Sequence, residues 1–166
     1  VDGLWTYGID EIWSGLQASY ADLCSDVRSR YGVELERLAG IGISAMMHGY
    51  MPFGKDGNIL VPFRTWRNTN TGRAARELSE LFDFNIPLRW SISHLYQAIL
   101  DGEEHVGRID FLTTLAGYIH WQLSGRRVLG IGDASGMLPV DSGAGDYSEE
   151  MIGKFDNLVS SKGFPW

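Results

Sequence analysis

Apolar residues recur at steps of three and four along residues 9 to 31, which predicts one long amphipathic helix. Asp10 and Glu11 suit the positive start of the helix dipole, and two arginines in the last turn suit its negative end. Gly32 can take the left-handed conformation that ends a helix. The apolar stripe consists of Ile9, Ile12, Trp13, Leu16, Tyr20, Leu23, Cys24, Val27 and Tyr31.

Two shorter patterns follow this helix. Residues 38–47, "LAGIGISAMM", are small and β-branched, and the run is long enough for a buried strand but too short for another helix. Residues 50–63, "YMPFGKDGNILVPF", alternate around Asp56 and Gly57, a pair that favours the positive φ angles of a tight turn. The sequence therefore predicts a helix, a strand and a hairpin in that order.

The second half of the chain shows four further helical stripes. Gly102 is expected to end the second, Asp110 to cap the third, Gly125 to close it, and Ser148 to cap the fourth. The stripes are Ala74, Ala75, Leu78, Leu81 and Phe82; Ile92, Leu95, Tyr96, Ile99 and Leu100; Leu112, Leu115, Ala116, Ile119 and Leu123; and Met151, Ile152, Phe155 and Leu158.

These elements indicate an α/β fold that is rich in helices and has only a small sheet. One strand and one hairpin are a thin sheet for so many helices to cover. The chain also starts on Val1 without a Met and stops on Trp166. We therefore expect an incomplete domain, with an open sheet edge or exposed apolar surface that invites self-association into a homo-oligomer.

Composition limits the classes of function. With 166 residues, of which 44% are hydrophobic, the chain can bury one core and is one domain or part of one. A net charge of -7 without a basic run argues against nucleic acid as a partner. The single cysteine, Cys24, fits the cytoplasm. No apolar stretch approaches the roughly 20 residues of a membrane span, so no membrane partner is expected.

Several familiar catalytic motifs are not matched. "GIGDASG", residues 130–136, has the wrong spacing for a dinucleotide loop and is interpreted as a structural turn. The four histidines at 48, 94, 105 and 120 lack the spacing of a zinc site. No nucleophile elbow accompanies Ser44 and His48, which argues against a hydrolase.

The stretch "AMMHG" leaves two interpretations open. Met46, Met47 and His48 follow the predicted strand, where α/β folds place ligand contacts, yet the methionines could equally fill core gaps while the histidine caps a turn. Trp66, followed by Arg67, could stack on the C–H face of a polyol, or it could be a core residue.

A family resemblance adds to this pattern. "GIGISAMMHGYMPFGKDGNILVPFRTWRNTNT" resembles the segment of the FGGY carbohydrate kinases written Gly-Ile-Ser-x-Gln-Met-His-Gly, followed by an Asp-x-x-Gly hairpin, Trp-Asn-Asp and an Arg. "RIDFLTTLAGYIHWQLSGRRVLGIGDASGMLPVD" is similar to the family's helix ending in Leu-Thr-Gly and its Asp-Ala-Ser segment, and "YSEEMIGKFDNL" to the helix after it. The resemblance covers nearly the whole chain.

The resemblance implies an ATP-dependent sugar kinase of the ribonuclease H-like, actin-like superfamily, with ATP and Mg²⁺ as cofactors. Residues 1–166 would be the central part of its N-terminal, sugar-binding domain. Met47 and His48 would contact the sugar, Trp66 would lie against it, and Arg89 and Trp90 occupy a place where some relatives carry another sugar-contacting aromatic. The substrate would be a pentulose, a hexulose or a related polyol.

The chain also departs from the family pattern. Met46 replaces Gln, the Trp-Asn-Asp triplet reads Trp66-Arg67-Asn68, and the Lys-x-x-Trp signature reads His94 to Gln97. The opening phosphate hairpin, the segment with the catalytic base and the C-terminal nucleotide domain do not occur in these residues. We therefore expect no catalytic, ATP-binding or metal residue in this chain, which alone would be inactive. The alternative is a non-catalytic sugar-binding or regulatory relative of the kinase fold.

Overall fold

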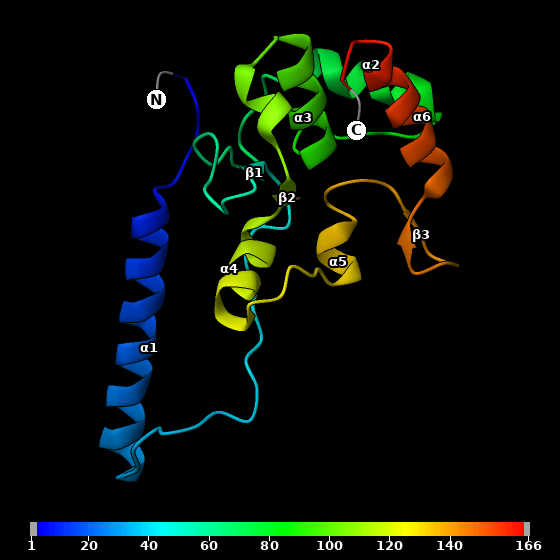
Figure 1. Ribbon diagram of the computed structural model, residues 1–166. Coiled ribbons are helices and arrows are strands. Elements are labelled where there is room, and N and C mark those ends of the chain that lie inside the picture. Colours follow the sequence, from blue (N-terminus) through cyan, green and yellow to red (C-terminus); the bar gives the residue numbers. More distant parts are fainter. Residues whose placement is uncertain (1–2, 165–166) are drawn as a thin grey trace.

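The computed structural model describes residues 3–164, and Figure 1 shows how their elements are arranged. The expectation drawn from the chain ends, Val1 and Trp166, lies outside the described residues. The elements follow in the order α1 (Ile9–Tyr31), β1 (Met51–Phe53), α2 (Gly72–Phe82), α3 (Ser91–Leu100), the 3₁₀ helix η1 (Glu104–Arg108), β2 (Phe111–Thr113), α4 (Leu115–Ser124), α5 (Ile131–Ala134), β3 (Val140–Asp141), β4 (Asp146–Tyr147) and α6 (Glu149–Ser160).

The first predicted helix is confirmed at both ends. The Gly8 N–H donates to the Glu11 carboxylate at 3.1 Å, and Gly32, at φ 66°, donates to the Arg28 carbonyl at 2.9 Å. Its apolar stripe is only partly covered, since none of its residues is buried and Tyr31 is 72% exposed. Figure 1 shows α1 along one side of the molecule. The first turns pack on the core through Ile9, Ile12, Trp13 and Leu16.

The strand predicted over residues 38–47 is wrong. This segment has no regular secondary structure, and its side chains are exposed or half-buried. In Figure 1 it runs as an extended connection from the end of α1 to β1. A buried strand needs a neighbouring strand whose backbone groups pair with its own, and among residues 3–164 no strand or bridge pairs with this segment.

The predicted turn at Asp56 and Gly57 is confirmed, but the hairpin is minimal. Gly57 has φ 77°, and the Asn58 backbone N–H donates to the Asp56 carboxylate at 3.0 Å. Only single bridges, Phe53 with Ile59 and Tyr50 with Arg64, join its two sides. β1 pairs instead with β2, antiparallel and with Pro52 opposite Leu112.

The helices of the second half are confirmed with one corrected boundary. The third begins at Leu115 rather than after Asp110, because Phe111–Thr113 is taken by β2 and Thr114 caps the helix by accepting from the Gly117 N–H at 3.1 Å. Gly125, at φ 73°, closes it as expected. Ser148 caps α6, as predicted, by accepting from the Met151 N–H at 3.4 Å.

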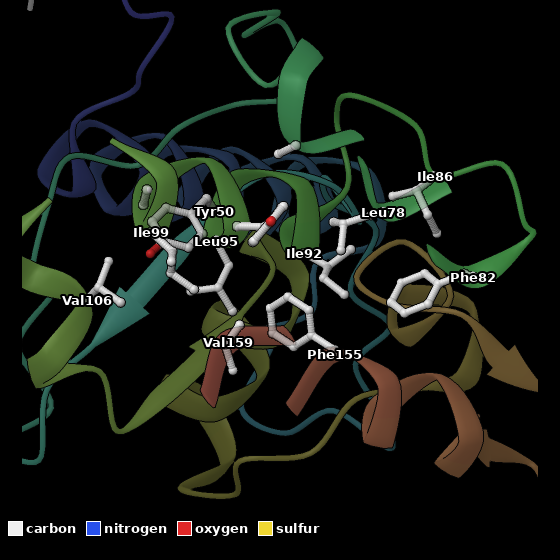
Figure 2. Close-up of a cluster of buried hydrophobic side chains, with 13 residues drawn as sticks. Tyr50, Leu78, Phe82, Ile86, Ile92, Leu95, Ile99, Val106, Phe155 and Val159 are labelled. Atoms are coloured by element: carbon white, nitrogen blue, oxygen red, sulfur yellow. The ribbon is translucent and has the colours of Figure 1, made fainter. Parts of the chain in front are cut away.

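The core consists of two clusters. One joins α2, α3 and α6, and Figure 2 shows Leu78 and Phe82, Ile92 and Ile99, and Phe155 meeting there. The other lies between β1 and α4 and contains Met51, Phe53, Phe63, Leu115, Tyr118 and Ile119.

The sheets are as small as expected: β1 with β2, and β3 with β4, make two antiparallel two-stranded sheets in the described part of the chain. Exposed apolar residues occur outside these sheets, with Leu23 of α1 47% and Ile41 66% exposed. No helix among residues 3–164 combines the length and the apolar character needed to cross a membrane.

Candidate functional site

The backbone turn at Gly49 is held between two distant segments. Its N–H donates to the Arg89 carbonyl at 3.1 Å, and its carbonyl accepts from the Ser91 hydroxyl at 2.6 Å. On the other side, Tyr50 and Arg64 exchange backbone hydrogen bonds of 2.9 and 3.2 Å. Gly49 has φ 113°, and an added Cβ would lie 2.5 Å from the Arg64 carbonyl oxygen. The residue after His48 must therefore be glycine.

His48 extends from this turn toward the segment after α5. Its Nδ1 lies 3.3 Å from the Gly136 carbonyl oxygen. Because a carbonyl only accepts, this contact assigns the proton to Nδ1 and leaves Nε2 as an acceptor. Burial lowers the pKa of His48, the Gly136 bond raises it, and the Arg89 charge lowers it, with a net shift below its ordinary value. The imidazole is therefore neutral at neutral pH.

Gly136 makes this approach possible. A Cβ on Gly136 would overlap the Met47 carbonyl oxygen and lie 2.6 Å from the Nδ1 of His48. "GIGDASG", predicted as a structural turn, in fact contains the one-turn helix α5. The glycine at its end was visible in the sequence, but nothing there indicated that it would touch His48.

Met47 is half-buried beside a hollow formed by residues 43–45 and the α5 segment. Asp133 and Ser135 line the same hollow, and neither was among the predicted site residues. Burial raises the pKa of Asp133 above its ordinary value. The hollow thus offers a thioether, a carboxyl and hydroxyls close to His48, a set that suits a polyol.

Trp66 directly follows Thr65, which packs on Gly49: a Cβ built on Gly49 would lie 3.5 Å from the Cα of Thr65. The Trp66 side chain is 50% exposed, which rules out the core alternative. Asn68 is buried and fixes the turn by donating to the carbonyls of Trp5, at 2.8 Å, and Thr65, at 2.9 Å. The Arg67 guanidinium lies over both indoles, 4.5 Å from Trp5 and 5.7 Å from Trp66.

Arg89 and Trp90 differ in their surroundings. Arg89 is exposed, and its charge acts on His48. Trp90 is half-buried at the start of α3, with its ring 6.3 Å from that of Phe84 and packed against the main core. The structure thus brings Met47, His48 and Arg89 together, with Trp66 one residue beyond the segment that contacts Gly49, whereas Trp90 packs on the core.

A buried polar network lies directly behind the Gly49 turn. Arg64 forms a bidentate ion pair with Glu103, with one hydrogen bond of 2.9 Å, and Glu103 lies 3.4 Å from the Nδ1 of His105. The Nε2 of His105 is 2.8 Å from the Tyr50 hydroxyl oxygen. Burial raises the pKa of Glu103, but the bonds and charge of Arg64 outweigh it and hold the pKa below its ordinary value. The network fixes the two residues, Tyr50 and Arg64, that flank Gly49.

His94 faces this network without joining it. It is fully buried, its ring is stacked 6.1 Å from that of Tyr50, and neither ring nitrogen has a hydrogen-bond partner in the structure of residues 3–164. Burial, and then the charge of Arg64, lower its pKa to about 3. His94 therefore stays neutral in the folded protein above that pH.

The described residues do not fit a site for Mg-ATP. Among residues 3–164, no group of three or more His, Cys, Asp or Glu side chains is placed to hold a metal ion. The glycine-rich segment forms a helix of only four residues, too short to present an anion site. What this region offers is uncharged hydrogen-bonding groups, the Asp133 carboxyl, two exposed arginines and an exposed indole.

The chain is similar to one known protein family. The FGGY family of carbohydrate kinases, N-terminal domain, matches residues 3–159. Among curated protein sequences, none matches the chain.

Solved structures share the fold. A xylulose kinase from Rhodospirillum rubrum has a TM-score of 0.73 at 18% identity, over 99% of this chain and 34% of that one. A gluconate kinase from Lactobacillus acidophilus has a TM-score of 0.72 at 16% identity, over 92% and 32%. A "xyloylose kinase" from Brucella ovis has a TM-score of 0.67 at 22% identity, over 79% and 29%. The chain thus spans about a third of the length of these proteins.

Proposed function

This chain belongs to the FGGY family of carbohydrate kinases, and from that membership we propose that the protein containing it transfers the γ-phosphate of Mg-ATP to a hydroxyl of a sugar. The acceptor is a pentulose, a hexulose or a related polyol. Residues 1–166 are the central part of the N-terminal domain, whose fold we infer to be ribonuclease H-like, and they supply part of the sugar-binding wall. The catalytic base and the Mg-ATP site lie in other segments of the protein.

The observation that carries this proposal is the arrangement around Gly49. The family model matches residues 3–159, which include this arrangement. Within it, a neutral His48 presents its Nε2 as a hydrogen-bond acceptor, beside Met47 and an exposed arginine. In the proposed complex, a sugar hydroxyl donates to this nitrogen, the Met47 thioether lies against the C–H face, and Trp66 stacks on the sugar. Arg89 and Trp90, on the segment that leads into α3, are proposed as further contacts to the sugar.

Substrate selection within the family is open to test, because the similar structures include proteins described as xylulose kinases and one described as a gluconate kinase. We also infer that the protein is cytoplasmic and forms a homo-oligomer. The exposed apolar residues of α1, Tyr20 and Leu23, support the second inference, since such a stripe is normally covered.

A coupled ADP-release assay tests the proposal. The full-length protein, with Mg-ATP, is assayed against a panel of ketoses, alditols and sugar acids. The proposal predicts that at least one member raises ADP formation well above the rate without sugar. If none does, although calorimetry shows that a sugar binds, the protein is the non-catalytic sugar-binding relative instead.

A further inference from the structure

Two exposed guanidinium groups border the candidate sugar site. In residues 3–164, neither Arg67 nor Arg89 has a carboxylate within ion-pair distance, although other arginines, such as Arg73 and Arg127, are paired. The chain as a whole carries a net charge of -7. Two unpaired positive charges therefore lie beside this site, although the chain as a whole is negative.

Arg89 is the nearer of the two to His48. Two hydrogen bonds fix the backbone here. The Arg89 carbonyl accepts from the Gly49 N–H at 3.1 Å, and the preceding Leu88 carbonyl accepts from the Thr71 hydroxyl at 2.6 Å. Its charge is felt at the His48 imidazole. A ligand bound to His48 therefore lies in the field of a guanidinium that no acid of the described chain neutralises.

Arg67 is held in one orientation by two indoles. Its guanidinium carbon lies 4.5 Å from the Trp5 ring centre and 5.7 Å from that of Trp66. Stacking occupies the flat face of a guanidinium and leaves its N–H edges free, and these edges match the two oxygens of a carboxylate. Trp5 is itself anchored, since its N–H donates to the Asn68 side chain at 2.9 Å.

The hollow beside the candidate site carries a single acid among its lining residues. Asp133 is the one acid that lines the hollow beside Met47. Burial raises its pKa above the ordinary value, which means that its charged form is less favoured there than in water. Two exposed arginines and one acid thus lie on the segments that border the candidate site. His48 adds no charge, because its pKa is lowered.

We propose that the acceptor is a sugar acid, an aldonate or a related polyol carboxylate, whose carboxylate is bound by Arg89 and attracted by Arg67 while a hydroxyl donates to His48. The inference rests on the proposed kinase function and narrows its substrate class. A carboxylate, with one charge and two coplanar oxygens, matches a single guanidinium. A sugar phosphate would place two negative charges there and need more donors.

Matched substrate pairs test this proposal in the full-length protein. Gluconate and glucitol, and xylonate and xylitol, differ only in a carboxylate against a hydroxymethyl group, and xylulose and a ketose phosphate complete the panel. We expect the kcat/KM of an acid to exceed that of its neutral partner by about tenfold or more. Raising the ionic strength should lower the value for the acid more than for the neutral partner.

Variants show whether the arginines are responsible. Arg89→Gln is expected to lower kcat/KM for the acid by about tenfold or more while changing the neutral partner less than about threefold, and Arg89→Lys to recover part of the loss. Arg67→Gln should act in the same direction but less strongly. Arg76, exposed on α2 and likewise outside every ion pair of residues 3–164, supplies the matched control Arg76→Gln, expected to change neither substrate. Thermal unfolding confirms that each variant is folded.

The outcomes separate this inference from the proposed function. Preference for xylulose or an alditol, or an equal loss on acid and neutral partner in Arg89→Gln, would overturn the inference and leave the kinase activity standing. Preference for the ketose phosphate would overturn the choice of carboxylate. If no sugar at all stimulates ADP formation, the proposed function itself fails.

Discussion

The Nδ1 of His48 lies 3.3 Å from the carbonyl oxygen of Gly136, and the two residues approach so closely that Gly136 has no room for a side chain. The contact joins two segments that are 88 positions apart in the sequence. It fixes the tautomer and orientation of the imidazole that we propose as the sugar ligand.

Gly136→Ala should displace His48 and lower kcat/KM for the sugar by about 10- to 100-fold, because misplacing a binding group by about 1 Å can cost this much. Gly153→Ala is the control, since a Cβ on Gly153 meets nothing within 4 Å. Steady-state kinetics of the two variants check the prediction. Equal activity in both would mean that the His48 position does not matter for the sugar.

His48→Ala should raise the sugar KM or lower kcat/KM, because a ligand hydroxyl left without its acceptor costs about 1–3 kcal/mol. The KM for ATP should be unchanged. His120→Ala, on α4, is the comparison, since its ring nitrogen only meets the Ser124 side chain of the same helix. An unchanged dependence of the rate on sugar concentration in His48→Ala would return this histidine to a structural role.

Some of the fold was predictable because its signals are local. The helix over Ile9–Tyr31 and the caps at Gly125 and Ser148 follow from periodicity and backbone preference within a few residues. The strand over residues 38–47 was wrong because a strand exists only where another strand pairs with it, and such partners cannot be found in a local pattern. Asp110 does not cap the helix, because the next three residues form β2, which pairs with β1.

The candidate site was predicted only in part. Met47, His48, Trp66, Arg89 and Trp90 came from the family resemblance, and their sugar contacts remain predictions. The role of Gly136 could not be predicted from the sequence. Gly136 needs to lack a side chain only because the connection from α4 to β3 folds back against His48. Periodicity and spacing describe elements, whereas this contact is made by two irregular segments.

Breaking the Arg64–Glu103 pair should destabilise the protein. Arg64 is 6% exposed, so Glu103→Gln leaves a buried guanidinium without its counter-charge, and we expect a loss of about 3 kcal/mol in the free energy of unfolding. Glu150→Gln breaks the exposed Lys154–Glu150 pair and should change the free energy of unfolding far less, because solvent screens an exposed pair. Denaturant unfolding measures both, and similar losses would show that the buried pair is not special.

His94 should make the protein sensitive to acid. Its pKa is about 3 in the folded protein, against an ordinary value of 6.5, so the unfolded chain binds the proton first as the pH falls. The stability it contributes is complete above about pH 6.5 and decreases toward pH 3, by about 2 kcal/mol at pH 5.

His94→Gln tests this pH dependence. Whatever its stability at pH 8, the variant should lose less free energy of unfolding between pH 7 and pH 5 than the wild-type protein, because glutamine does not titrate. Denaturant unfolding at the two pH values gives the slope. The same loss in both proteins would assign the acid sensitivity to other groups, such as His105, whose pKa is also lowered by burial.

The isolated chain should not bind Mg-ATP, because residues 3–164 form no metal cluster and no phosphate loop. Calorimetric titration at millimolar nucleotide is expected to show no saturable heat, whereas the full-length protein should show it. Stoichiometric binding by the isolated chain would mean that its glycine-rich segment binds phosphate after all.

The most direct test of the account is a crystal structure of the full-length protein with the sugar that it phosphorylates. The account predicts a sugar hydroxyl within about 3 Å of the His48 Nε2, with Met47 and Trp66 against the ring or chain of the ligand. A sugar bound elsewhere, with His48 still turned to Gly136 and no ligand atom near its Nε2, would contradict it.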